Sequence, residues 1–235
     1  AAARSGGAAY DLNAPVVGNA AAGDAAISVD LLGGEARRAR AVVNCAGLHA
    51  DDVARMAGEQ PVSIYPRKGE FLVFSPAEPL REILLPVPTA LGKGMLVFPT
   101  IDGLVIAGPT AREREDKRDW SVEGDAAALI REQAERMYPA LARAEQIGSY
   151  AGLRPAGRGA NYVIEPSRAL AGLIHVAAIR STGLSASLGI GEHVAGMLAE
   201  HAGIELGSER RLRAAQVKGR GHWWTRAARY HEAPA

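Results

Sequence analysis

The strongest constraint on the fold is a strand, a turn and a helix that follow one another late in the chain. Residues 173–179 are apolar and read as a strand, Ser181-Thr182-Gly183 reads as a turn, and a helix is predicted over residues 184–201. A strand that leads directly into a helix is typical of α/β folds. The start of the helix also presents free backbone N–H groups and the positive end of its dipole to a ligand. The residues predicted to share one face of this helix are Leu184, Leu188, Gly191, Val194 and Leu198.

An arginine followed by a proline lies upstream of this unit, in the run Tyr150-Ala151-Gly152-Leu153-Arg154-Pro155. Pro155 disfavours helical backbone at Arg154, so the arginine is predicted to stand at the end of an extended strand. A guanidinium is always charged and offers a planar set of donors, which suits it to fixing a carboxylate or a phosphate. Taken alone, Arg154 is better read as a surface residue paired with an acid, and the context of the other two blocks is what favours a functional role.

A third block, Val42-Val43-Asn44-Cys45-Ala46-Gly47, precedes the other two in the order that one known family shares. With these three blocks the chain resembles the FAD-dependent oxidoreductases of the D-amino-acid oxidase superfamily. The run from Pro86-Val87-Pro88-Thr89 through Gly92-Lys93-Gly94 to Gly108-Pro109-Thr110 is most similar to its glycerol-3-phosphate dehydrogenase and 2-hydroxyglutarate oxidase branch. The resemblance covers residues 25–203 and implies an FAD cofactor.

The same resemblance implies an α/β fold in which a partial FAD-binding, Rossmann-like layer carries a mostly antiparallel substrate-binding sheet. We expect residues 1–60 and 151–204 in the FAD-binding domain, residues 61–150 in the substrate-binding sheet, and residues 205–235 in a basic tail. The activity implied is oxidation of a small anionic substrate (a 2-hydroxy acid, glycerol 3-phosphate or an amino acid) by hydride transfer to flavin N5.

The site residues follow from the positions that match the family. Arg154 is expected to hold the substrate anion, and the residues expected to border it are Tyr150, Arg67, Lys68 and Arg180. For Arg67 and Lys68, solvated charges at the start of a strand are an equally good reading. The residues expected at the cofactor are Cys45, Ala46, Gly47, Gly152, Ser181, Thr182, Gly183 and Leu184. No general base is assigned, and no histidine or cysteine spacing indicates a metal.

One part of the family pattern is missing. No Gly-x-Gly in the chain is followed by the third glycine of the Gly-x-Gly-x-x-Gly turn that seats the FAD pyrophosphate, and the chain starts at Ala1 without Met. We therefore expect the C-terminal portion of a longer flavoprotein. The alternative is a non-catalytic fragment or binding module that does not hold FAD alone. A short-chain dehydrogenase is disfavoured because Tyr65-Pro66-Arg67-Lys68 has the wrong spacing for a Tyr-x-x-x-Lys motif and Pro66 interrupts the helix that this motif needs.

Amino-acid composition limits the kinds of binding partner and cellular location that we expect for this protein. Lys and Arg total 27 against 26 Asp and Glu, so no strong field favours nucleic acid. The lone Cys45 suits a reducing compartment, and with no apolar run near the length of a membrane span we expect a cytoplasmic protein. The tail around Trp223-Trp224 could touch an anionic membrane surface, although a tail folded on the body is the favoured reading. The electron acceptor is open among oxygen, a quinone and another protein.

Local patterns predict the remaining elements. Residues 25–32 and 36–44 read as a hairpin about Gly33-Gly34, Asp51 or Asp52 opens a short helix that Gly58 ends, and Asp102-Gly103 joins another hairpin. Ser121 is predicted to cap a helix that runs to Tyr138. The segments expected to form the strands of the substrate-binding sheet are 69–75, 83–85, 95–100, 104–108, 147–154 and 161–165.

Overall fold

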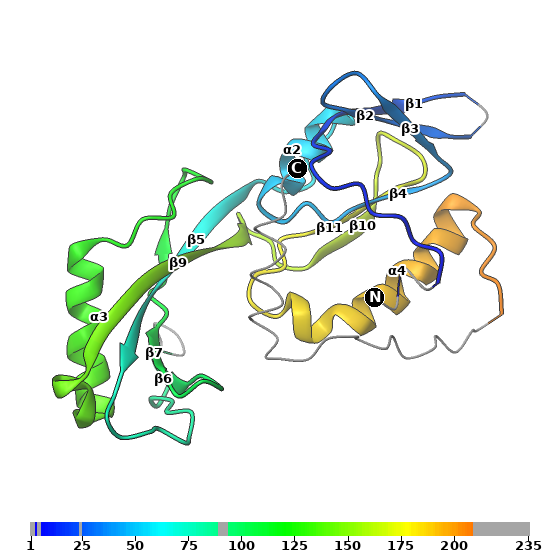
Figure 1. Ribbon diagram of the computed structural model, residues 1–235. Helices are drawn as coiled ribbons and strands as arrows, with labels where there is room; N and C mark the ends of the chain where they lie inside the picture. Colours follow the sequence, from blue (N-terminus) through cyan, green and yellow to red (C-terminus); the bar gives the residue numbers. More distant parts are fainter. Residues whose placement is uncertain (1–2, 4–5, 24, 89–93, 209–235) are drawn as a thin grey trace. The chain divides into compact units, whose positions relative to one another are not determined.

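A computed structural model describes residues 3, 6–23, 25–88 and 94–208 of the chain (Figure 1). Val16–Glu205 form one unit by their contacts, and Ala1–Pro15 with Leu206–Ala235 form another. In the second unit, described residues 6–15 and 206–208 contain no strand. Every site below lies within the unit Val16–Glu205. Thr89, Gly92, Lys93 and the Trp223-Trp224 tail lie outside the described residues.

The largest sheet is antiparallel and is built on two long paired strands. Its order is β6-β7-β5-β8, and β9 pairs with the other side of β5. The register runs from Ile64↔Gly157 to Ser75↔Glu145, with one irregularity near Phe74. The strands are β5 (Ile64–Ser75), β6 (Leu96–Pro99), β7 (Val105–Gly108), β8 (Arg112–Glu113) and β9 (Glu145–Gly157).

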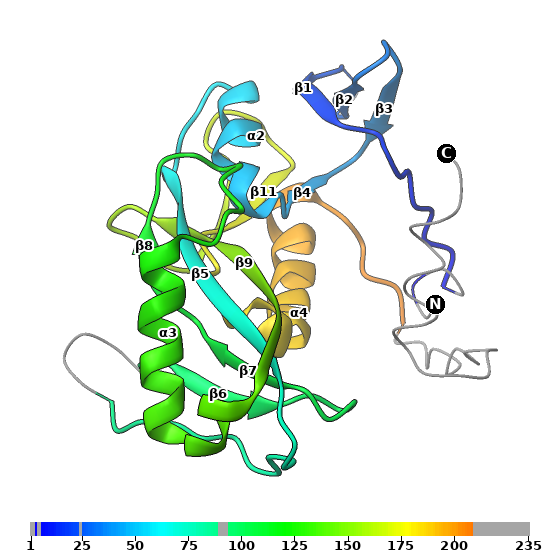
Figure 2. The same ribbon diagram turned by 60° about the vertical axis from the view of Figure 1, so that its left-hand side comes forward.

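Helix α3 (Gly124–Met137) lies along one face of this sheet, as Figure 2 shows, and is followed by the 3-10 turn η2 (Pro139–Arg143). Alternate residues of β5 are buried, as expected for a strand with one covered face. Leu72 and Phe74 on that face pack with Ile130 and Ala134 of α3 in the main apolar cluster. The opposite face carries Arg67 and Phe71 and is not covered by α3.

The second sheet has the order β10-β11-β4 and includes a parallel pair of strands. β11 (Leu173–Ala177) pairs parallel with β4 (Val42–Asn44) and antiparallel with β10 (Val163–Pro166). All five residues of β11 are buried. Helix α4 (Gly183–Ala202) follows β11 and packs Val194 and Met197 against Ile174 and Val176. A left-handed Gly203, with φ of 59°, ends the helix.

A third, three-stranded antiparallel sheet joins β1 (Val16–Ala21), β2 (Ile27–Leu31) and β3 (Ala36–Ala39). Gly33 and Gly34 both have positive φ between β2 and β3, which confirms the predicted hairpin. The turn after β4 is the 3-10 segment η1 (Gly47–His49), and the short helix α2 (Ala50–Met56) follows it directly. Gly58, with φ of 84°, terminates α2 as predicted.

Several local predictions are wrong. Residues 36–44 form two strands in two sheets, and residues 161–165 contribute to β10, which leaves the large sheet because Gly159 and Tyr162 turn the chain with positive φ. Residues 83–85 contribute only an isolated bridge from Leu84 to Val97. No strand is predicted over residues 16–21, which form β1 and pair with β2.

Two helix predictions also need correction. Ser121 does not cap α3, because the helix begins after Glu123 and the Ser121 hydroxyl bonds Asp119 and Lys68. On α4, Val194 is buried as predicted, whereas Leu184 and Leu188 are 92% and 89% exposed. The packing of α4 against the β11 cluster therefore involves Ile190 and residues after it, whereas Leu184 and Leu188 face away.

Within residues 3, 6–23, 25–88 and 94–208, no helix combines the length and the apolar character needed to cross a bilayer. In the same part of the chain, no group of three histidine, cysteine or acidic side chains is arranged to hold a metal ion.

Candidate functional site

A cavity of about 480 Å³ opens where the parallel strands, the end of β9 and the start of α4 meet. A volume of this size is typical of small-molecule sites. The turn after β4 lines it through Cys45 and Gly47, β9 through Pro155, and α4 through Gly183 and Ser187. The remaining walls are apolar and come from Val43, Val176, Ala177, Ala178, Ile179, Ile190, Gly191 and Val194. Cys45 is an exposed residue of this wall, and partial burial of its thiol raises the pKa of that group.

The corner between β11 and α4 is held by a loop that the sequence analysis did not single out. The backbone N–H of Tyr162 donates to the Ala178 carbonyl at 3.2 Å, and both residues have positive φ (57° and 55°). The Tyr162 hydroxyl bonds Thr182 Oγ1, and Arg180 Nε donates to Asn161 Oδ1 at 3.4 Å. Left-handed backbone at a tyrosine and an alanine is uncommon. The geometry of this corner is therefore fixed by tertiary contacts.

The turn after β4 is fixed by a buried polar chain. Asn44 Oδ1 accepts from the Ala46 N–H at 3.2 Å, and its Nδ2 donates to the Ala50 carbonyl at 2.8 Å. The same Nδ2 lies 3.2 Å from Nδ1 of His175, so Nδ1 is the acceptor nitrogen of that ring. His175 Nε2 then carries the proton and donates to Glu59 Oε1 at 3.0 Å. Two strands of the parallel layer are thereby locked to the cavity wall.

Arg154 makes hydrogen bonds to backbone carbonyls only. Its Nε donates to the Arg67 carbonyl at 3.0 Å, and its Nη2 donates to the carbonyls of Lys68 and Thr110 at 3.3 and 2.9 Å. Among the residues that the structure describes, no carboxylate pairs with it, and both N–H groups of Nη1 lack a protein acceptor. Burial first, and then the charges of Arg67 and Arg180, lower the pKa of Arg154. The guanidinium nevertheless stays charged.

Arg67 and Arg180 add positive charge around Arg154. Arg67 faces Arg154 across the β5–β9 pair, so the two side chains share the uncovered face of the sheet. Arg67 pairs with the exposed Glu113, its Nη1 lying 3.6 Å from Oε1. Tyr150, four residues from Arg154 along β9 and on the same face, stacks on Phe71 with a ring-centroid distance of 4.8 Å. The surface thus presents a cationic end and an aromatic end.

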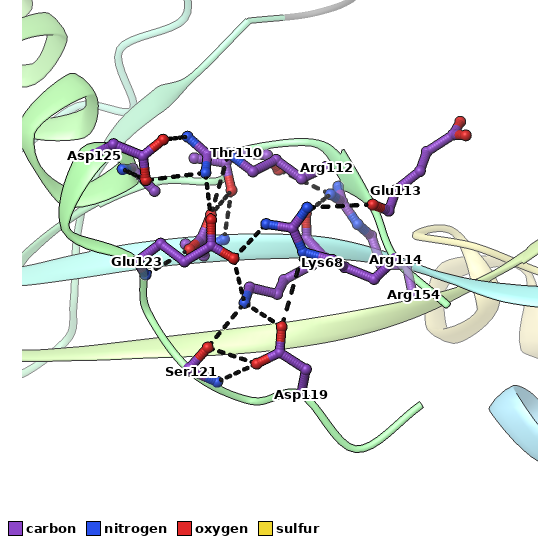
Figure 3. A network of polar contacts seen from close by, with 12 residues as sticks. Lys68, Thr110, Arg112, Glu113, Arg114, Asp119, Ser121, Glu123, Asp125 and Arg154 are labelled. Atoms are coloured by element: carbon purple, nitrogen blue, oxygen red, sulfur yellow. Dashed lines mark hydrogen bonds and ion pairs between the residues drawn. The ribbon is translucent and has the colours of Figure 1, made fainter. Parts of the chain in front are cut away.

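Lys68 lies elsewhere. Its side chain is fully buried on the α3 face of β5, where Nζ donates to Asp119 at 2.7 Å, Ser121 at 3.1 Å and Glu123 at 3.4 Å. Figure 3 shows the ammonium group between these three acceptors. Neighbours on a strand point to opposite faces, so Lys68 cannot join Arg67 beside Arg154. Its contacts therefore favour a structural role, and its place in the substrate site stays a prediction.

Buried Glu70 completes this ionic cluster. Its carboxylate accepts from the Thr110 hydroxyl at 2.7 Å and from the Glu123 backbone N–H at 2.9 Å. Arg112 reaches Glu123 and Asp125 at 2.7 and 2.9 Å, which ties the start of α3 to the strand. Figure 3 shows Arg112, Glu123 and Asp125 in this network of polar contacts.

The structure thus brings together some of the predicted substrate-binding residues and some of the predicted cofactor-binding residues. Arg154, Arg67 and Arg180 lie close enough for their charges to interact, and Tyr150 lies on the same face of the sheet. Of the predicted cofactor residues, Cys45, Gly47 and Gly183 line the cavity. The other predicted cofactor residues do not line the cavity. They are Ala46, Gly152, Ser181, Thr182 and Leu184.

Comparison with known proteins places the chain in a family. A sequence model of the family described as FAD dependent oxidoreductase matches residues 1–197. Glycerol 3-phosphate dehydrogenase of Caloramator mitchellensis is 33% identical over 159 residues, covering 67% of this chain and 33% of that protein. The mitochondrial L-2-hydroxyglutarate dehydrogenase of Arabidopsis thaliana is 31% identical over 176 residues, covering 66% of this chain and 36% of that protein.

The fold agrees with this. L-alpha-glycerophosphate oxidase from Mycoplasma pneumoniae, solved with FAD bound, superposes with a TM-score of 0.74 at 23% identity. The superposition covers 85% of this chain and 53% of that one. The chain spans about a third of the length of the two relatives named above. Because the family match extends over most of its residues, the chain belongs to the FAD dependent oxidoreductase family.

Proposed function

We propose that the protein containing this chain oxidises a small anionic substrate, with Arg154 holding the anion beside the cavity. The observation that carries the proposal is the state of Arg154: a charged guanidinium without a carboxylate partner among the described residues, on a strand whose next residue, Pro155, lines the cavity. A half-buried cation is stabilised when an anion completes its hydrogen bonding.

The lining of the cavity fits the ring end of FAD. Its walls are apolar, as a flat tricyclic ring requires, and Gly183 brings the N-terminal end of α4 to one side. The first N–H groups of this 20-residue helix have no intrahelical partner and suit a group that gains negative charge on reduction. Cys45, Gly47, Pro155 and Gly183 would hold the ring, and FAD when bound would accept a hydride at N5. The lining includes no three-glycine turn.

The chain's own residues would orient the substrate. Arg154 would fix the substrate's anionic group so that one C–H bond faces the cavity, which is an effect of orientation. Arg67 and Arg180 would attract the anion electrostatically but would not replace Arg154 as its main contact. Each already has a partner, Glu113 for Arg67 and Asn161 for Arg180. We assign no general base, and the substrate's hydroxyl or amine proton would leave to water.

Glycerol 3-phosphate and L-2-hydroxyglutarate are the first substrates to test, because the relatives described above are named for them. A 2-amino acid is the third class. The electron acceptor is open among oxygen, a quinone and another protein. A cytoplasmic location, and a peripheral membrane contact through the tail outside the described residues, both stay predictions.

The test is to purify the chain with added FAD, remove unbound cofactor and record the visible spectrum. Retained flavin absorbance that is bleached anaerobically by one of the three substrates supports the proposal. Chain that folds but retains no flavin supports the alternative, a binding module or fragment that does not hold FAD alone. Retained flavin that none of the anions reduces would argue against an anionic substrate.

A further inference from the structure

We propose that Gly69 is a positioning residue for Arg154. Because glycine has no side chain, the space beside β5 at this position is open, and the Arg154 guanidinium occupies it. The inference rests on the proposed role of Arg154 as the group that holds the anion. Gly69 would act through Arg154, without itself contacting substrate or cofactor.

The register of the two long strands puts both residues on one face. Arg67 is opposite Arg154, and Gly69 is opposite Gly152 at the next position on that face. The Arg154 side chain crosses from β9 to β5, where Nε bonds the Arg67 carbonyl and Nη2 bonds the Lys68 carbonyl. The guanidinium therefore lies against the backbone of β5 beside Gly69.

A side chain at position 69 would meet this guanidinium. A Cβ built on Gly69 would lie 2.9 Å from Cβ of Pro109, 3.1 Å from Nη2 of Arg154 and 3.3 Å from its Cζ. The φ of Gly69 is outside the left-handed region, so alanine is allowed on backbone grounds. An alanine at position 69 would therefore be disfavoured only by its close contacts with Pro109 and Arg154.

Both neighbours are closer than a Cβ normally allows, with Pro109 the closer at 2.9 Å, and the guanidinium is the group that moves more easily. Pro109 precedes Thr110, which is tied to β5 because its N–H donates to the Glu70 carbonyl at 3.2 Å and its hydroxyl accepts from the Glu70 N–H at 3.0 Å. The guanidinium stands at the end of a flexible side chain. A methyl group on residue 69 would therefore displace Nη2 from the carbonyls of Lys68 and Thr110.

The displacement matters because three carbonyls aim the rest of the group. With Nε and Nη2 fixed, the two N–H groups of Nη1 have one direction in which to receive an anion. A guanidinium released from those carbonyls must be ordered again by the substrate, which weakens binding. We expect Gly69→Ala to raise KM about fivefold to tenfold, the scale of one lost hydrogen bond, with a smaller change in kcat.

The test compares Gly69→Ala with Gly148→Ala in the full chain. Gly148 is on β9 of the same strand pair, and a Cβ there would make only an ordinary contact, 3.9 Å from Cβ of Val73. One measurement needs neither cofactor nor substrate: the Nε–Hε signal of Arg154 in a spectrum of arginine-labelled protein, assigned by its loss in Arg154→Lys. We expect this signal to shift and exchange faster in Gly69→Ala and to be unchanged in Gly148→Ala.

The second measurement is KM for glycerol 3-phosphate and for L-2-hydroxyglutarate, in a double-mutant cycle with Arg154→Ala. If Gly69 acts through Arg154, Gly69→Ala raises KM in the native background and adds nothing once Arg154 is truncated. If Arg154→Ala itself leaves KM unchanged, the proposed role of Arg154 fails. If Arg154→Ala raises KM but Gly69→Ala matches Gly148→Ala in both measurements, the positioning role alone is overturned.

Failure to fold is also informative. If Gly69→Ala is unfolded and the double variant with Arg154→Ala regains its thermal transition, the methyl group clashes with the guanidinium, as proposed. If both are unfolded, Pro109 takes the contact and the inference is wrong.

Discussion

Replacing Lys68 by Met tests whether the ionic cluster under β5 stabilises the fold. Lys68 has no exposed surface, and Nζ bonds Asp119, Ser121 and Glu123. Met keeps an unbranched stem of similar length, so the apolar contacts of the side chain are largely retained. The variant therefore removes the charge and its three hydrogen bonds.

The magnitude follows from what is left behind. Breaking a buried ion pair by removing one partner costs about 3 to 5 kcal/mol, because the other charge is left without compensation. Here Asp119 and Glu123 are 26% and 36% exposed, so water can reach both carboxylates. Glu123 also keeps Arg112 and Arg114. We expect a loss of about 2 to 3 kcal/mol, below that range, which lowers Tm by roughly 4 to 12 °C in a chain of this size.

Urea unfolding followed by circular dichroism measures this loss, with Arg136→Met as the matched control. Arg136 is 74% exposed and pairs with Glu132 on the outer surface of α3, so its replacement should cost less than about 1 kcal/mol. A loss for Lys68→Met no larger than that of the control would refute a structural role. A rise in KM without a loss of stability would return Lys68 to the substrate site.

The other predictions concern the site and its surroundings. Arg154→Ala should lower kcat/KM by tens to over a hundredfold, since about 2 to 3 kcal/mol is the scale of a lost charge-assisted hydrogen bond; steady-state kinetics would refute the role if the ratio is unchanged. Tyr162→Phe removes the hydroxyl that bonds Thr182 and should weaken FAD binding by about fivefold in a fluorescence titration, whereas an unchanged affinity would separate that corner from the cofactor. Stability should fall in acid, because hydrogen bonds from Lys68 lower the pKa of Asp119 and those from Arg114 lower that of Glu123. For Glu59, burial raises the pKa, but the hydrogen bonds from Ser167 and His175 together outweigh burial, so the net pKa is lowered. A lowered carboxyl pKa contributes stability that is complete above the unfolded value near 4 and is lost as pH falls through the folded value, so urea midpoints should be level from about pH 5 to 7 and drop below about pH 4.

The sequence predicted the parts of the fold that local patterns control. The Gly33-Gly34 hairpin, the end of α2 at Gly58 and the β11–α4 unit agree with it because turn chemistry and periodicity specify each within a few residues. The break at Arg40 and Ala41 was missed, since an extended chain that changes sheets has the same pattern as one long strand. β10 was assigned to the wrong sheet for the same reason.

The site was less accessible to sequence reasoning. Consecutive Arg67 and Lys68 must face opposite sides of a strand, so at most one of them could share the face of Arg154. The register that decides between them is a tertiary property. Tyr162 carried no signal, because left-handed backbone at a tyrosine is set by contacts with Ala178 and Thr182. The Asn44–His175–Glu59 chain joins residues far apart in sequence, and no local pattern connects them.

Thr110 touches both sides of β5. Its carbonyl receives the Arg154 guanidinium, while its hydroxyl donates to the Glu70 carboxylate, beneath which α3 begins. A shift in the first turn of α3 would therefore reach, through Thr110, the guanidinium that is proposed to hold the substrate anion. Substrate preference in this architecture could be retuned by directed evolution from the rear of the sheet, with every residue that lines the cavity left as it is.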